Sequence, residues 1–155
     1  MAGRKKEVEG IRLVSGSPEE TARIGARLAA AAGRGAVISL EGGLGAGKTC
    51  LVKGMAAGLG IDAEVLSPTF ILVEEYRGDV TLLHYDLYRL EEMEEVESLG
   101  FFDAIDGENM LVVEWGDRLP DPDRIFDVRV RITITGEGQR EIDIHGDAEL
   151  LERMR

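Results

Sequence analysis

The strongest constraint on this chain is the sequence Gly-Gly-Leu-Gly-Ala-Gly-Lys-Thr at residues 42–49, which completes the pattern Gly-x-x-x-x-Gly-Lys-Thr of a phosphate-binding loop. An apolar run at residues 36–40 precedes this motif, and a helix-like stretch at 51–59 follows it. This order predicts a buried strand, a sharp turn and a helix whose first N–H groups converge on one point. The alternative is a glycine-rich turn with an accidental Lys-Thr pair, and the strand and helix on either side argue against it.

The loop predicts a binding site for a nucleoside triphosphate. Gly42, Gly45 and Gly47 permit backbone angles that a Cβ would forbid. The bared amides and the positive end of the following helix then form a pocket for phosphate. We expect Lys48 to reach the β- and γ-phosphates and the Thr49 hydroxyl to bind magnesium.

Cys50 directly follows the motif, at a position where phosphate-loop proteins often have Ser or Thr bonding the α-phosphate. A thiol is a weaker hydrogen-bond donor than a hydroxyl, although the backbone N–H of the residue still serves. We therefore interpret Cys50 as a tolerated variant within the nucleotide site and not as a nucleophile.

The composition predicts one domain over residues 1–155, with a flexible tail at residues 1–9. A chain of 155 residues with 44% hydrophobic residues can bury a sizeable core. No apolar run approaches the roughly 18–20 residues that cross a bilayer, and the charged N-terminus leads into no apolar signal core. The single cysteine fits a reducing compartment. We therefore expect a cytoplasmic protein without a membrane partner.

The charge of the chain bears on its partners. Thirty acidic against eighteen basic side chains give a formal net charge of −12. Because such a surface repels nucleic acid, we expect no DNA partner and no unaided tight binding to RNA. The basic cluster at residues 4–6 is the local exception, and we interpret it as a solvated chain end.

Other patterns predict the elements around the loop. Ser17 as N-cap, Pro18 in the first turn and Glu20 in a capping box predict the start of a helix that Gly33 ends. Further patterns predict strands at 70–73, 80–85 and 110–113, an acidic helix at 91–99 ended by Gly100, a hairpin through 128–134 and 142–144 with one face in water, and a short helix at 148–155. The sum is an α/β fold of the P-loop NTPase type, a three-layer structure with a mixed sheet and a C-terminal antiparallel hairpin. The order of the strands does not follow from these patterns.

Catalysis at a phosphate loop needs a second group that holds magnesium, and a carboxylate at the end of a buried strand is the usual candidate. Glu114 follows the strand at 110–113, and Asp86 follows the strand at 80–85. Either acid could instead be a surface residue at a strand end. We expect at least one of the two to face the metal.

Two histidines and the single tryptophan have no defined role from the sequence. His84 and His145 lie in strand-like runs without a partner at metal-ligand spacing, so we interpret them as structural or surface histidines. Trp115, the single tryptophan, is either a packing anchor or part of the site wall.

Four stretches in order go beyond a general phosphate-loop protein: the motif at 42–49, Ser-Pro-Thr-Phe at 67–70, His-Tyr-Asp-Leu-Tyr-Arg at 84–89 and Val-Glu-Trp at 113–115. Together they closely resemble the bacterial TsaE family, the small ATPase that supports threonylcarbamoyladenosine modification of tRNA. The resemblance runs from about residue 11 to residue 145. It departs from the family at Gly43, where relatives usually carry Asp, and at Cys50, where they usually carry Thr.

The resemblance implies a role for each matching position. Thr49 and Glu114 would hold Mg²⁺, Asp86 would be an essential acid near the γ-phosphate, and the segment 67–70 would be a switch-like loop in which Thr69 helps to orient water. Arg140 matches a position that contacts the nucleotide in relatives. The residues that would bind the ATP phosphates are Gly45, Ala46, Gly47, Lys48, Thr49 and Cys50.

The resemblance also implies a partner. Relatives act with the TsaB–TsaD heterodimer, which transfers the threonylcarbamoyl group to adenosine in tRNA. A TsaE-type chain would hydrolyse ATP, slowly alone and faster in the complex, to reset that heterodimer between turnovers, and would meet tRNA only indirectly. Two alternatives stay open: a small-molecule kinase, against which the scattered arginines and the short 67–70 segment argue, and a nucleotide-dependent binding switch with negligible turnover.

Overall fold

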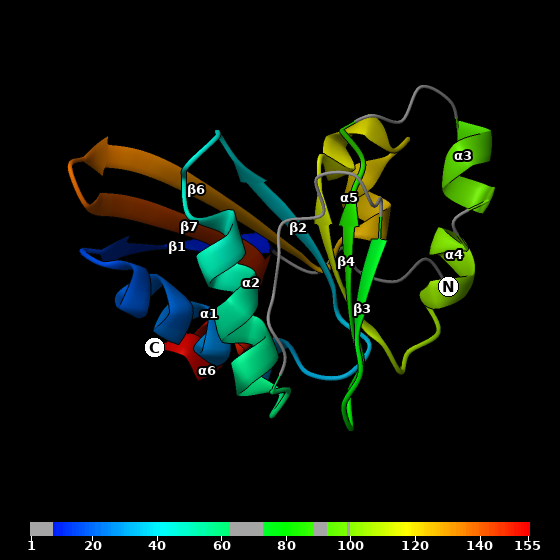
Figure 1. Cartoon of the computed structure of the whole chain (residues 1–155), viewed down its shortest axis with the longest axis horizontal. Coiled ribbons are helices and arrows are strands. Elements are labelled where there is room, and N and C mark those ends of the chain that lie inside the picture. The colour runs from blue at the N-terminus through cyan, green and yellow to red at the C-terminus, as the bar shows by residue number, and fades with distance from the viewer. Residues whose placement is uncertain (1–7, 63–72, 89–92, 99) are drawn as a thin grey trace.

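The computed structural model describes residues 8–62, 73–88, 93–98 and 100–155, and its centre is a seven-stranded mixed sheet of order β1-β7-β6-β2-β5-β4-β3 (Figure 1). Strands β6, β2, β5 and β4 run parallel to one another. Strand β3 is antiparallel to β4, β7 is antiparallel to β6, and β1 is antiparallel to β7. The strands are β1 (Val8–Ser15), β2 (Val37–Gly42), β3 (Val73–Tyr76), β4 (Leu82–Asp86), β5 (Met110–Glu114), β6 (Val128–Gly136) and β7 (Gln139–Asp147).

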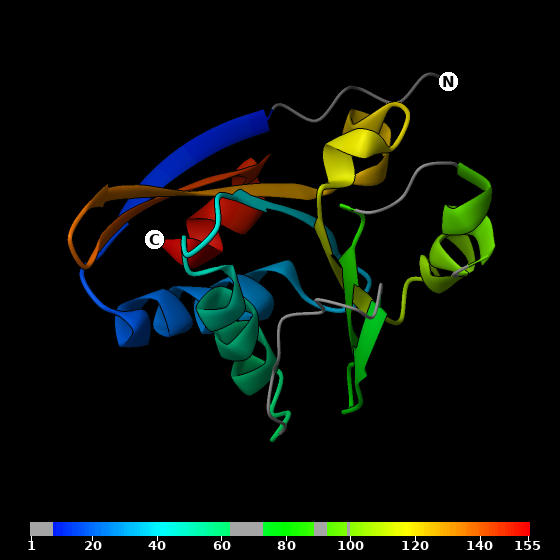
Figure 2. The same cartoon turned by 45° about the horizontal axis from the view of Figure 1, so that its top comes forward.

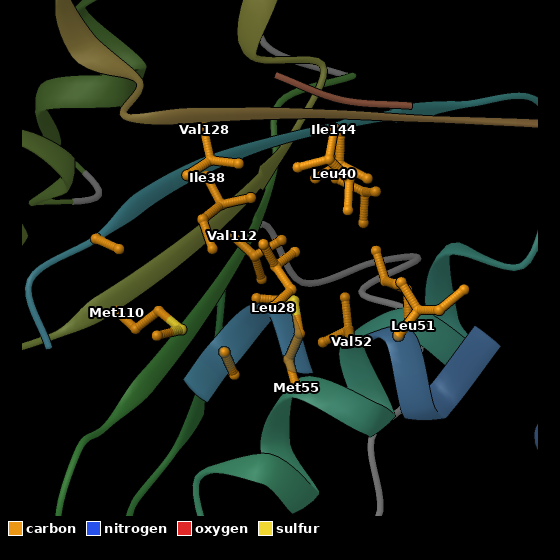
Figure 3. Close-up of a cluster of buried hydrophobic side chains, with 14 of the residues drawn as sticks. Leu28, Ile38, Leu40, Leu51, Val52, Met55, Met110, Val112, Val128 and Ile144 are labelled. Atoms are coloured by element: carbon orange, nitrogen blue, oxygen red, sulfur yellow. The ribbon is translucent and has the colours of Figure 1, made fainter. Parts of the chain in front are cut away.

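Helices lie on both faces of the central strands (Figures 1 and 2). On one face α1, α2 and α6 pack against apolar side chains of the sheet, including Ile38, Leu40 and Val112 (Figure 3). On the other face Val96 and Phe101 of the short helices α3 and α4 pack against alternate strand residues. The helices are α1 (Pro18–Ala32), α2 (Lys48–Gly58), α3 (Met93–Ser98), α4 (Phe101–Ala104), α5 (Pro122–Ile125) and α6 (Ala148–Met154), with a 3₁₀ turn η1 (Gly116–Arg118). The predicted three-layer α/β fold with a mixed sheet is confirmed.

The second helical layer packs on β2, β5, β4 and the start of β3. On β6 and β7 one face is apolar and buried, and the opposite face carries charged and polar side chains that contact water. Arg131 on that outer face is 67% exposed. The predicted C-terminal hairpin with one wet face is therefore confirmed.

Helix α1 begins as its sequence predicts. The Ser17 hydroxyl accepts the N–H of Glu20 at 3.1 Å, and the Glu20 carboxylate accepts the N–H of Gly16 at 2.9 Å, so the reciprocal bond goes one residue further back than in a standard capping box. Gly33 ends the helix with φ +75°. Among the described residues, no helix is long and apolar enough to cross a membrane.

Other boundaries differ from the prediction. Strand β1 was not predicted, and Val8 and Glu9, placed in the flexible tail, belong to it. Residues 1–7 of that tail lie outside the described residues, as do residues 70–72 of the strand predicted at 70–73. The acidic helix predicted at 91–99 is present as α3, and Gly100 at φ +68° turns the chain after it, as predicted, but the short helix α4 that follows was not predicted. Residues 91, 92 and 99 of that segment lie outside the described residues.

Two helices that flank the loop cross at glycines. A Cβ on Gly54 of α2 would lie 1.9 Å from the carbonyl oxygen of Ala22 in α1, and a Cβ on Gly25 of α1 would lie 2.2 Å from the carbonyl oxygen of Leu51. The two backbones therefore approach too closely for any side chain. Because α2 starts at the loop, this contact fixes the axis along which the loop amides point.

We expect Gly54→Ala to destabilise the fold by about 1–3 kcal/mol, since the new methyl group meets a backbone carbonyl that cannot move aside. Alanine's higher helix propensity, worth about 1 kcal/mol, offsets only part of this loss. Urea denaturation measures the difference. Gly43→Ala is the control, because nothing lies within 4 Å of a Cβ built there; equal stability of the two variants would contradict the close crossing of α1 and α2.

Candidate functional site

The loop between β2 and α2 forms the floor of a pocket of ≈ 1290 Å³. Gly45 and Gly47 have φ +75° and +107°, backbone angles that side chains disfavour. A Cβ on Gly42 would come within 3.2 Å of the Ala46 side chain and of the Ile132 carbonyl oxygen. The loop thus has the strand, turn and helix context that the sequence predicts. Its residues line the pocket together with Thr49 and Cys50 at the start of α2.

Arg140 at the start of β7 holds the carbonyl side of the loop. Its Nε donates to the Ala46 carbonyl oxygen at 2.9 Å, and its Nη2 donates to the Gly45 carbonyl oxygen at 3.2 Å. Arg140 is not among the residues that line the pocket. The structure therefore places this predicted nucleotide contact behind the loop, on its backbone.

The two candidate acids lie side by side. Asp86 ends β4 and Glu114 ends β5, and the two residues are paired in register on these neighbouring parallel strands. Both line the pocket. Two adjacent carboxylates repel each other unless a cation lies near them. The edge of the sheet beside the loop is thus a site that favours positive charge.

Glu114 contacts the loop lysine directly. The Lys48 Nζ lies 2.9 Å from Glu114 Oε1, and the His84 Nε2 lies 2.7 Å from Glu114 Oε2. Burial raises the pKa of Glu114, but the hydrogen bonds and charges of His84 and Lys48 outweigh it, so the pKa is lowered below its ordinary value. Glu114 is therefore a carboxylate at neutral pH, with both oxygens engaged.

His84 is the neighbour of Glu114 that the sequence did not identify. Of its two interpretations, structural or surface histidine, the structure supports the first, since it buries His84 at 1% exposure against the carboxylate of Glu114. The signal was present in the spacing, because residues two apart on a strand share a face, which puts His84 and Asp86 on the same side of β4. His145, in contrast, is exposed on β7.

Aromatic side chains form one rim of the pocket. Trp115 and Tyr88 line it, with ring centroids 4.9 Å apart, and the Arg118 guanidinium lies over both rings. Trp115 is 39% exposed and has φ +62°, unusual for a residue with a side chain. Of its two open interpretations, packing anchor or site wall, the geometry favours the wall. Thr69, predicted to orient water, and the rest of segment 67–70 lie outside the described residues.

The residues of the pocket fit a nucleotide with magnesium. Thr49, Asp86 and Glu114 offer hydroxyl and carboxylate oxygens, which Mg²⁺ prefers, usually alongside substrate phosphates. Among the described residues, no three His, Cys, Asp or Glu side chains are grouped so that they could hold a metal ion. A cation at this edge would thus combine one or two carboxylates with oxygens of the ligand.

Comparisons with known proteins agree with this geometry. The family model described as "Threonylcarbamoyl adenosine biosynthesis protein TsaE" matches residues 15–142. A tRNA threonylcarbamoyladenosine biosynthesis protein TsaE from Treponema pallidum is 40% identical over 134 residues, which is 86% of this chain and 99% of that protein. Its counterpart from Bacillus subtilis is 43% identical over 129 residues, 81% of this chain and 79% of that protein.

The crystal structure of Bacillus subtilis YdiB superposes with a TM-score of 0.73 at 31% identity, over 97% of each chain. This likeness agrees with the P-loop fold described above. The family model and the relatives cover most of this chain. The chain therefore belongs to the TsaE family, whose members take part in tRNA threonylcarbamoyladenosine biosynthesis.

Proposed function

We propose that this chain is a magnesium-dependent ATPase of the cytoplasm that acts on the TsaB–TsaD heterodimer and resets it between rounds of tRNA modification. The observation that carries this proposal is the 2.9 Å contact between Lys48 of the loop and Glu114 at the end of β5. It joins the residue expected to bind phosphate to the residue expected to bind magnesium. The order of motifs from 42 to 115 supports ATP as the ligand.

Binding requires an exchange of partners at this contact. In the described structure the Lys48 ammonium and the Glu114 carboxylate neutralise each other inside the pocket. A triphosphate offers Lys48 a more highly charged anion than Glu114. When the Lys48 ammonium moves to the phosphate, Glu114 Oε1 loses its cation. A buried carboxylate that has lost its counter-ion is unfavourable, so Glu114, still bonded to His84, would then favour a metal ion. Magnesium bound there would neutralise charge on the transferring phosphoryl group.

Further residues of the pocket would complete the chemistry. The Thr49 hydroxyl and the loop amides would bind phosphate and metal. Asp86 is half-buried beside Glu114, with Oδ1 accepting the N–H of Tyr88 at 3.0 Å. Its place at the strand edge suits an acid that orients water, as the family resemblance implies.

The charges of the pocket account for a dependence on a partner. Arg131 is the arginine that lines the pocket within the described ranges, and it pairs with Glu41 at 3.0 Å. No free guanidinium of the described residues thus faces the phosphates to stabilise charge in the transition state. Since such a group raises phosphoryl-transfer rates by about 10³–10⁵-fold, hydrolysis by the chain alone should be slow. The net charge of −12 also favours a protein partner over direct contact with RNA.

We expect Lys48→Ala to lower ATP hydrolysis by about 10²–10³-fold, as for loss of one group that stabilises transition-state charge. Lys53→Ala, which removes an exposed lysine of the same helix, should leave the rate unchanged. Phosphate release under excess Mg²⁺ measures both, and circular dichroism checks the fold. Full activity of a folded Lys48→Ala protein would refute the assignment.

Arg140→Ala tests whether Arg140 acts through the loop. A trans peptide points its N–H opposite to its C=O, so a bond to the Ala46 carbonyl directs the Gly47 N–H away from Arg140. If Arg140 orders the loop, its loss should weaken the binding of pyrophosphate and of ATP by the same factor, about 10-fold or more, because two charge-assisted bonds to the loop are lost. Calorimetry compares the two ligands. The control is Arg129→Ala, because the Arg129 guanidinium pairs with Asp123 on the outer face and not with the loop. Weakening of ATP alone would show that Arg140 contacts the nucleoside.

The partner is tested by the rate of hydrolysis. Adding purified TsaB–TsaD should raise phosphate release by the wild-type chain, and the Lys48→Ala chain should show no such rise. A rate unaffected by the heterodimer, with complex formation that depends only on bound ATP, would support the binding switch with negligible turnover instead.

A further inference from the structure

His84 is a buried polar side chain without an evident reason in packing. It is 1% exposed on β4 between the buried residues Leu83 and Tyr85. Its Nε2 contacts Glu114 Oε2 at 2.7 Å, while its Nδ1 has no hydrogen-bond partner among the described residues. Burying a polar atom without a partner is unfavourable, and an apolar residue would avoid it. The contact with Glu114 therefore points to the role of the ring.

The sheet places His84 behind Glu114 as seen from the pocket. His84 is paired in register with Val112, two residues before Glu114 on β5, so the imidazole reaches the carboxylate diagonally along one face of the sheet. Glu114 and Lys48 line the pocket, and His84 does not. One carboxylate oxygen thus faces inward to the histidine, and the other faces the loop.

We propose that His84 is a positioning residue that holds Glu114 Oε2 inside the fold and so presents Oε1 to the metal. This inference rests on the proposed function. While Lys48 contacts Oε1, the carboxylate is fixed from both sides. Once Lys48 moves to phosphate, the bond to His84 is the remaining hydrogen bond of the Glu114 carboxylate among the described residues. Because Nε2 faces a carboxylate, which only accepts, we assign the N–H to Nε2, which donates a hydrogen bond to Oε2. Loss of such an outer partner typically weakens metal binding about 10–100-fold.

The test compares binding of a non-hydrolysable ATP analogue with Mg²⁺ and with EDTA, by calorimetry on the full chain. Mg²⁺ should raise the affinity of the wild type for the analogue, and His84→Leu should make this gain about 10–100-fold smaller. The affinity measured in EDTA should change little. His84→Gln, which keeps an N–H donor at similar reach, should restore most of the gain. His145→Leu, at an exposed histidine of β7, should match the wild type.

A purely structural role for His84 predicts a different result. His84→Leu would then change the free energy of unfolding in urea but leave the Mg²⁺-dependent gain at its wild-type value, which would overturn the inference. If His84→Leu does not fold, His84→Asn replaces it, because its shorter amide does not reach Oε2; equal Mg²⁺ gains for the Asn and Gln variants would overturn the inference. A wild-type chain that binds no analogue with Mg²⁺ would instead refute the proposed function itself.

Discussion

The ion pair between Lys48 and Glu114 is the interaction on which the site depends. Each charge lies in a pocket where it would be unfavourable alone, and each is the other's partner in the described structure. A lone anion that bound Lys48 would leave the Glu114 carboxylate without its lysine counter-ion, and a lone cation that bound Glu114 would leave the Lys48 ammonium without its carboxylate. The site therefore favours a ligand that brings both charges together, which a polyphosphate with a divalent metal does.

The strand order decides which acid meets the lysine. Along the chain, Asp86 comes first after the loop, and Glu114 follows much later. In the sheet, however, β5 lies directly beside β2, and β4 lies one strand further out. Because parallel strands end at one edge, Glu114 is the acid next to Lys48, and Asp86 lies one strand further out, where its Oδ1 accepts the N–H of Tyr88. This gives the two carboxylates different surroundings.

The sequence predicts the local features well and the long-range contacts poorly. The loop, the cap of α1 and the apolar run of β5 depend on neighbouring residues, so spacing and turn chemistry suffice to find them. Strand β1 was missed because its pattern is irregular: Val14 is exposed and Ser15 is buried. The bonds of His84 to Glu114 and of Arg140 to the loop join residues 30 and about 94 apart, and they exist only because of the strand order. No local pattern contains that order.

The C-terminal hairpin is part of the pocket rather than an appendage to it. A loop that turns its amides toward a ligand leaves its carbonyls facing the other way, where they need donors. Its glycines add to the difficulty, because residues with so much conformational freedom lose the most entropy on being fixed. The planar guanidinium of Arg140 donates to two successive loop carbonyls, which gives them hydrogen-bond donors. The same bonds limit the conformational freedom of the peptides between Gly45 and Gly47. Strand β7, paired between β6 and β1, provides the rigid support from which a single side chain can order the loop before any ligand arrives.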